Sequence, residues 1–408
     1  MVSVMFVDDN QAGLTILKEA FGRIGDGWQT SFVPGGDVAL HVMAERPVDA
    51  IVTSTPLSGM SAASFLRLAK MQYPRTARIA LTSPGDKGAQ LSALPVANQC
   101  LSKACGPGTL TRTVRRATEL QAKLFSEATQ RVVAQVGALP SMPSALAAVD
   151  QALSDEECSL SEIADVMSTD VAIVAKILQL VNSAFFGLRT EIRDLRQAVA
   201  YLGIEALRDF ALAGSVFRAF TPSPLLPADW LAAFNAHSLA VSGTMTQLAR
   251  TSATKCEANV VGTLHAVGEL VVAERAPQLL TEIAAEVAAG ADPAEAEARR
   301  MGTTYPVIGG HLLSLWGLGY HVVEAVTFQR EGSDGGSERE LVDMVRVADF
   351  VVSSPGELWD EPGARGLVDN VPLVCPASRR LHLDEAYLSK VGLLDEVLLL
   401  HQGFLQLR

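Results

Sequence analysis

The sequence predicts a two-part fold, in which an α/β unit with a doubly wound, five-stranded parallel sheet precedes an all-α helical bundle. Over the first ~120 residues, short apolar runs alternate with helical patterns, the order typical of a parallel sheet covered by helices. From Leu139 onward strand signals are few and helix caps recur at short intervals, which indicates a bundle.

The composition is that of a packed globular protein, because 49% of the 408 residues are hydrophobic and 19% are charged. The formal net charge is −12 and no run of Lys and Arg offsets it, so nucleic-acid binding is not expected. No apolar run has the length of a membrane span and the first residues lack a basic leader, so we expect a cytoplasmic protein that does not bind membranes. The five cysteines are scattered, which favours reduced thiols over disulfides or zinc ligands.

The predicted sheet begins with the apolar run VSVMFV at residues 2–7, which is typical of a buried strand. Four further strands and the helices between them follow at regular intervals. The predicted strands lie near 29–33, 50–52, 78–82 and 99–101, and predicted helices lie near 14–21, 36–45, 62–72 and from 108 onward. In such a fold, functional groups collect outside the carboxyl ends of the strands.

Polar residues follow four of these strands. Asp8 and Asp9 follow the first strand, Ser54 the third, Thr82 the fourth and Lys103 the fifth. This order resembles the receiver domain of two-component response regulators over residues 1–122. The resemblance implies that the acid pair holds Mg²⁺, that an aspartate after the third strand accepts a phosphoryl group, and that the Thr and Lys detect it.

The residue at the acceptor position is Ser54, which departs from the family pattern. A hydroxyl cannot form an acyl phosphate, and its presence removes one anionic oxygen ligand from a site for a hard cation. Without a neighbouring base, a serine is also a poor nucleophile. The sequence therefore predicts a pseudo-receiver in which Asp8, Asp9, Thr82 and Lys103 are remnants of the phosphorylation pocket.

The connection between the two parts is predicted to be one continuous helix over residues 108–136, because apolar residues recur there at helical spacing. Such a helix can pack on its own sheet, transmit a rearrangement between domains, or form the seam of a parallel homodimer. The sequence leaves these alternatives open.

Caps define the helices of the second part. Ser159 and Glu162 form the pattern of a capping box, and Asp170 has the position of an N-cap for the next apolar stripe. Asp194 starts a further helix that is expected to end at Gly203. A final amphipathic stretch predicts a helical extension over residues 356–408, packed on the bundle.

Several motifs of the second part resemble the HDOD domain over residues 137–355. They are the run from Leu139 to Pro143, Asp170, and a run that contains Asn182, Ser183, Phe185 and Gly187. The resemblance implies a helical relative of HD-type metal-dependent phosphohydrolases whose ligands have decayed, commonly joined to receiver domains in bacterial signalling.

The resemblance also implies where a metal site would have been. His237 and His265 match two histidine positions, and Asp349 matches the last acidic ligand. Ala266 replaces the aspartate that pairs with the motif histidine, and Tyr305 occupies a later histidine position. Because the central carboxylate is missing, we expect no tight metal binding, no cofactor and no catalytic residue.

Three functions compete at this stage. The preferred one is a non-enzymatic bacterial signal-transduction regulator or scaffold that binds other signalling proteins, such as a sensor kinase or a cyclic-dinucleotide enzyme. A residual HD-type phosphohydrolase would need a metal. A nucleotide or cyclic-dinucleotide sensor would need donors, for which Arg189, Arg193 and Arg196 are candidates.

Overall fold

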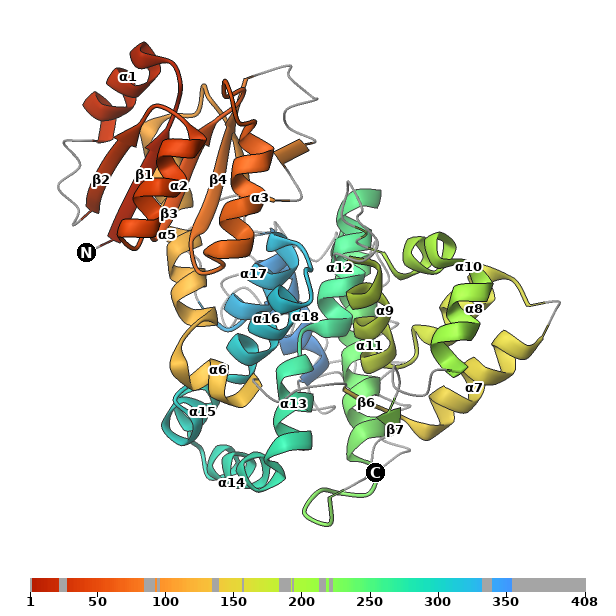
Figure 1. Ribbon diagram of the computed structural model, residues 1–408. Helices are drawn as coiled ribbons and strands as arrows, with labels where there is room; N and C mark the ends of the chain where they lie inside the picture. Colours follow the sequence, from red (N-terminus) through yellow and green to blue (C-terminus); the bar gives the residue numbers. More distant parts are fainter. Residues whose placement is uncertain are drawn as a thin grey trace. The chain divides into compact units, whose positions relative to one another are not determined.

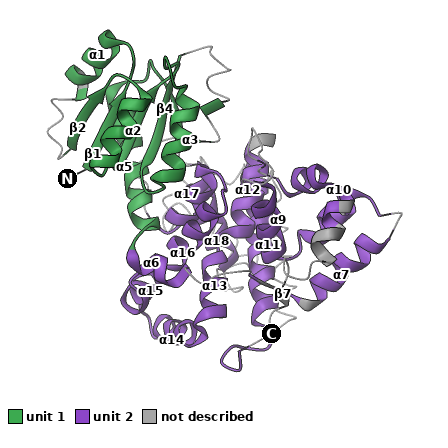
Figure 2. Cartoon of the chain, in the orientation of Figure 1, with its two compact units in different colours: residues 1–126, 188–191 green, residues 127–187, 192–408 purple. Residues whose placement is uncertain are grey.

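The computed structural model of the chain describes residues 2–21, 28–83, 92–93, 96–133, 139–155, 158–182, 192, 194–212, 218–219, 223–331 and 340–353. The chain forms two compact units, one up to Ser126 and one from Glu127 onward (Figure 2). Each unit has its own core, so the two are described separately. None of the described helices is both long and apolar enough to cross a membrane.

The first unit is a parallel sheet with strand order β2-β1-β3-β4-β5, which confirms the predicted doubly wound fold (Figure 1). Its strands are β1 (Val2–Val7), β2 (Trp28–Val33), β3 (Ala50–Ser54), β4 (Ala77–Thr82) and β5 (Gln99–Ser102). Its helices are α1 (Gln11–Phe21), α2 (Gly36–Glu45), α3 (Ala62–Gln72) and α5 (Pro107–Leu124). Most of the segment between β4 and β5 lies outside the described residues.

Alternate residues of the buried strands face opposite layers of helices. On one face, Met5 and Ile51 pack in a single core with Phe65 of α3. On the other face, Phe6 stacks on Phe21 of α1 with ring centroids 5.1 Å apart. Both faces of the sheet are thus covered, and the carboxyl ends of its strands carry the polar residues.

The connector is not the single helix that the apolar spacing predicts. α5 ends at Phe125, whose backbone leaves the helical region, and α6 (Glu127–Val133) begins two residues later. The amide of Phe125 closes the last turn of α5 on Gln121, and the amide of Ser126 bonds to Lys123. The prediction of an unbroken helix is wrong here, because the apolar pattern continues through a position where the backbone turns.

The second unit is a helical bundle, as predicted, with one short two-stranded ladder. Its helices before the centre are α7 (Pro143–Ser154), α8 (Leu160–Met167), α9 (Val171–Asn182) and α10 (Leu195–Leu212), and its strands are β6 (Pro140–Ser141) and β7 (Arg218–Ala219). The central and later helices are α11 (Trp230–Leu248), α12 (Ser252–Leu264), α13 (Val267–Arg275), α14 (Pro277–Ala288), α15 (Pro293–Met301), α16 (Tyr305–Leu315), α17 (Tyr320–Phe328) and α18 (Glu340–Ser353). The predicted extension over residues 356–408 lies outside the described residues.

The predicted caps are present. The Ser159 side chain accepts from the Glu162 amide and the Glu162 carboxylate accepts from the Ser159 amide, which completes the capping box. Asp194 accepts from the Gln197 amide at the start of α10. Gly203 interrupts that helix with φ 73°, a left-handed conformation that favours glycine.

A close backbone approach in the bundle joins α11 and α12. A Cβ atom on Gly262 would lie 2.4 Å from the Ser242 Cα atom, so only glycine fits at this position. The Ser242 hydroxyl donates to the carbonyl of Asn259 and accepts from the Thr263 hydroxyl, which holds the helices at this spacing. The missing side chain at Gly262 therefore sets the distance between the two helices.

We expect Gly262→Ala to lower the free energy of unfolding by more than about 3 kcal/mol, because the new methyl group meets backbone atoms that cannot rotate away. Urea unfolding followed by circular dichroism measures the change. Gly243→Ala is the matched control on α11, since nothing lies within 4 Å of its Cβ position and alanine favours a helix. Equal stability of the two variants would contradict the close approach.

Candidate functional site

Two histidines and one aspartate meet in the centre of the second unit, and we call them the histidine–aspartate cluster. His237 lies on α11, His265 directly follows α12, and Asp349 lies on α18. These three helices pack against one another, as Figure 1 shows. The structure thus brings together three residues that the family resemblance had named separately.

The ligand atoms of the cluster are close enough to share one ion. His237 Nε2 lies 3.2 Å from His265 Nε2 and 3.2 Å from Asp349 Oδ1. His265 Nε2 lies 3.9 Å from the same Asp349 oxygen. The His265 side chain is 4% exposed, whereas His237 is 27% and Asp349 34% exposed, so the cluster opens toward solvent on one side.

A backbone carbonyl fixes the orientation of the His265 ring. Nδ1 of His265 lies 2.6 Å from the carbonyl oxygen of Gly262, so this nitrogen carries the proton and donates it. The unprotonated Nε2 then points into the cluster. Burial lowers the pKa of His265 to about 4, an effect that Asp349 opposes and His237 strengthens, so the ring is neutral near pH 7.

The carboxylate of Asp349 is held in its charged form. Burial alone would raise its pKa, but the hydrogen bond from His237 and the proximity of His265, His237 and Arg330 outweigh burial and keep the pKa well below its usual range. The cluster thus combines a neutral imidazole with a charged carboxylate, which is the ligand chemistry of a divalent metal site.

A charged shell that the sequence analysis missed lies around the cluster. Glu297 of α15 is 1% exposed, and its carboxylate accepts from the Arg330 guanidinium at 2.5 Å and from the Tyr305 amide at 2.8 Å. Glu269 of α13 interacts electrostatically with His237, Arg330 and Asp349, and burial raises its pKa. Periodicity places acidic and basic residues of helices at the surface, so no sequence signal separated Glu297 or Glu269 from solvated side chains.

Gln329 and Arg330 follow α17, and both have structural contacts. Gln329 donates to the carbonyl of His265 at 2.8 Å and so supports the turn that carries the ring. The pKa of Arg330 is raised although burial acts against this, because the charge and the hydrogen bond of Glu297 outweigh burial.

The two other degenerate positions lie where the resemblance places them. Ala266 is the N-cap of α13 and brings only a methyl group to the turn after His265. Tyr305 is the first residue of α16, and its buried hydroxyl has no hydrogen-bond partner among the described residues. Burial raises the Tyr305 pKa, with Glu297 and Glu269 adding to the effect, so the phenol stays neutral.

The motif residues that the structure describes are structural. The fully buried Asp170 accepts from the Met142 amide at 2.8 Å and from the Ile173 amide at 3.0 Å, so it ties β6 to the start of α9. The Asn182 side chain donates to the carbonyl of Ile192 and accepts from its amide. Ser183, Phe185 and Gly187 lie outside the described residues.

The polar edge of the sheet in the first unit has no acceptor aspartate. The hydroxyl of the buried Ser54 donates to Asp8 Oδ2 at 2.5 Å. Asp9 accepts from Ser58, which lowers the Asp9 pKa, with a smaller contribution from Lys103. The Thr82 hydroxyl donates to the Leu101 carbonyl. Ser54 thus has the Asp8 carboxylate beside it, contrary to the expectation that no base neighbours this serine.

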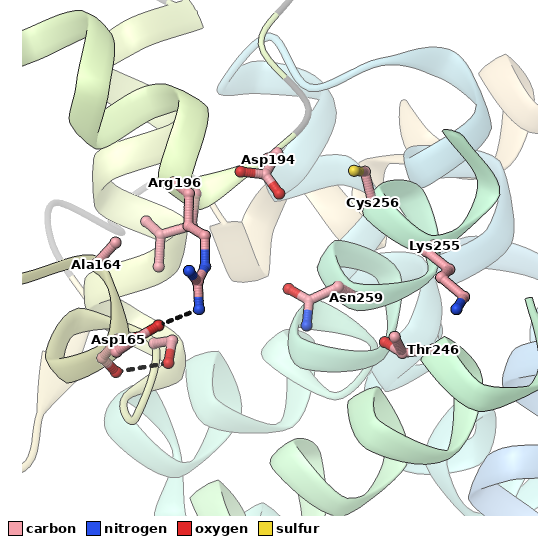
Figure 3. Close-up of a pocket in the computed structure, with 10 residues that line it drawn as sticks. Ala164, Asp165, Asp194, Arg196, Thr246, Lys255, Cys256 and Asn259 are labelled. Carbon is pink, nitrogen blue, oxygen red and sulfur yellow. Dashed lines mark hydrogen bonds and ion pairs between the residues drawn. The ribbon is translucent and has the colours of Figure 1, made fainter. Parts of the chain in front are cut away.

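A separate hollow of about 270 Å³ lies between α8, α10, α11 and α12 (Figure 3). Arg196, the described member of the three arginines proposed as anion donors, bonds there to Asp165 at 2.5 Å and to Ser161. Asp194 faces the Cys256 thiol across the hollow (Figure 3). Burial raises the pKa of that thiol, and Asp194 raises it further. The carboxylates of Asp165 and Asp194, and the guanidinium of Arg196 already bonded to Asp165, do not favour the binding of an anion in this hollow. Arg189 and Arg193 lie outside the described residues.

The chain thus combines a receiver-like α/β unit with a helical bundle that holds the histidine–aspartate cluster. Residues 139–331 match the HDOD family, and this part of the chain is an HDOD domain. The match lies inside the predicted span of residues 137–355 and ends before α18, so Asp349 comes from outside it.

Solved structures are similar to parts of this chain. The MmoQ response regulator of Methylococcus capsulatus str. Bath is 24% identical, with a TM-score of 0.50, over 62% of this chain and 97% of that chain. The signal receiver domain of an HD domain-containing protein from Pseudomonas fluorescens Pf-5 is 26% identical, with a TM-score of 0.28, over 29% of this chain and 96% of that one.

An uncharacterized protein of Treponema pallidum (strain Nichols) is 26% identical over 221 residues. The matched part is 52% of this chain, and the chain spans 42% of that relative's length.

We expect Arg330→Met to lower the free energy of unfolding by roughly 2–3 kcal/mol, because it leaves the Glu297 carboxylate buried without its cation. This is less than for a fully buried pair, since the Arg330 side chain is 38% exposed. Denaturant titration measures the loss. The double variant Arg330→Met/Glu297→Gln should recover part of it, and Arg300→Met, at an exposed ion pair, should change stability little. A loss as large for Arg300→Met would contradict this account.

Proposed function

We propose that the chain is a signalling regulator whose output is binding to other signalling proteins, and that neither phosphorylation of its receiver-like unit nor hydrolysis by its HDOD domain is required. The HDOD match and the receiver-like fold support a signalling protein. The observation that carries the finer proposal is the hydrogen bond from Ser54 to Asp8.

The Ser54–Asp8 pair affects both the phosphoryl acceptor and the cation site of a receiver. The acceptor position holds a hydroxyl, which cannot form an acyl phosphate. The same hydroxyl engages the Asp8 carboxylate, one of the two acids that would bind a hard cation in a receiver. The unit keeps the packed sheet and its surface, which support a role in recognition of other proteins.

A metal-dependent phosphohydrolase is the second candidate, and the convergence of His237, His265 and Asp349 is the observation that favours it. Against it stand the methyl group of Ala266 at the central carboxylate position and the engagement of Arg330 by Glu297. An arginine held by a buried carboxylate is not free to bind a substrate phosphate. We therefore rank regulation by binding above hydrolysis.

We expect the full-length protein to keep its mass when it is incubated with acetyl phosphate and Mg²⁺, because Ser54 offers no carboxylate acceptor. Ser54→Asp should gain one phosphoryl group, since Asp8, Asp9, Thr82 and Lys103 then surround an aspartate. Intact-mass spectrometry checks both, with Ser54→Ala as the matched control. A wild-type adduct that Ser54→Ala lacks would overturn the pseudo-receiver proposal.

Binding and hydrolysis are separated by two measurements on the full-length chain. Cross-linking in the cells that make it, followed by affinity purification and mass spectrometry, should yield stoichiometric signalling proteins, and Ser54→Ala should yield the same set. Purified protein should not hydrolyse bis(p-nitrophenyl) phosphate or cyclic dinucleotides with Mn²⁺ or Fe²⁺. Hydrolysis that is lost in Asp349→Asn but kept in His321→Ala, on the exposed start of α17, would favour the enzyme instead.

A further inference from the structure

We propose that His237 Nε2, His265 Nε2 and the Asp349 carboxylate bind one divalent transition-metal ion in the HDOD-containing unit. This goes beyond the proposed regulatory function, which does not depend on a metal. It also departs from the expectation drawn from Ala266, and four features of the cluster support it.

The first feature is the spacing of the ligand atoms. Bonds of ~2.0–2.1 Å in a tetrahedral site place neighbouring ligand atoms ~3.3 Å apart. The His237–His265 and His237–Asp349 separations are both 3.2 Å, and the third edge is 3.9 Å. The Asp349 side chain is 34% exposed, and a rotation of its carboxylate would shorten that edge, so that one ion could contact all three groups.

The second feature is the support behind His265. Histidines that bind metals usually donate their other ring nitrogen to a carbonyl or carboxylate, which fixes the tautomer. His265 Nδ1 does this with the Gly262 carbonyl at 2.6 Å, and Gln329 in turn donates to the His265 carbonyl. The Nε2 lone pair is therefore aimed at the cluster before any ion arrives.

The third feature is the charge of the surroundings. The buried Glu297 carboxylate pairs with the guanidinium of Arg330. The Asp349 carboxylate instead faces the two imidazoles, so a divalent cation bound by the cluster would meet its negative charge.

The fourth feature is the number and kind of ligands. Two imidazoles and one carboxylate are a complete protein ligand set for zinc sites that keep a water molecule, and for mononuclear iron(II). The methyl group of Ala266 removes a fourth protein ligand and leaves the remaining position to water. The partial exposure of His237 and Asp349 gives the ion a path of entry.

The test is a Co²⁺ titration of the full-length, chelator-treated protein, followed by visible absorption spectroscopy. We expect one Co²⁺ per chain with the d–d bands of a four- or five-coordinate ion, displaced by Zn²⁺, and a rise in melting temperature with Zn²⁺. Asp349→Asn, which keeps the side-chain shape, should weaken Co²⁺ binding more than about 100-fold, and so should His237→Gln. His321→Ala should bind like the wild type.

Two results would overturn the proposal. One is a wild-type protein without d–d bands and without a Zn²⁺-dependent melting shift. The other is a Co²⁺ site that Asp349→Asn and His237→Gln leave unchanged, which would place the ion elsewhere on the chain. Circular dichroism of each variant confirms that it is folded. Neither result bears on the Ser54 phosphorylation experiment, so the two proposals fail separately.

Discussion

The close approach of α11 and α12 at Gly262 is the constraint on which the functional centre depends. It brings the helix that carries His237 against the helix that ends at His265, and the Ser242 hydroxyl joins the two backbones. The same Gly262 provides the carbonyl that orients the His265 ring. One residue without a side chain thus sets both the distance between the two imidazoles and the direction of one of them, and α18 then needs only to add Asp349.

Local signals were sufficient to predict most of the fold. The alternating apolar runs predict the parallel, doubly wound sheet of the first unit, and the Ser159–Glu162 capping box depends only on neighbouring residues. The break at Phe125 was not predictable in this way, because the apolar spacing continues through it while the backbone turns. Periodicity reports which side chains are buried and is insensitive to a local break in the helical backbone.

The sequence identified the residues of the candidate site but not their arrangement in space. Motif spacing named His237, His265 and Asp349, but residues separated by 28 and 84 positions meet only through tertiary packing. The buried charges were missed altogether, since Glu297 and Arg330 have the sequence pattern of a solvated surface. The expectation of no tight metal binding rests on the carboxylate that Ala266 lacks, whereas the proposed metal site rests on how closely the three remaining ligand atoms lie.

The hydrogen bond between Ser54 and Asp8 has a consequence for timing under the proposed function. In a phosphorylated receiver, the rate at which the acyl phosphate hydrolyses sets how long the signal lasts. A unit whose acceptor position holds a serine bonded to a neighbouring carboxylate has no acyl phosphate to hydrolyse. Its signalling state then persists as long as the polypeptide does, and synthesis and degradation of the protein become the steps by which a cell sets the strength of the response.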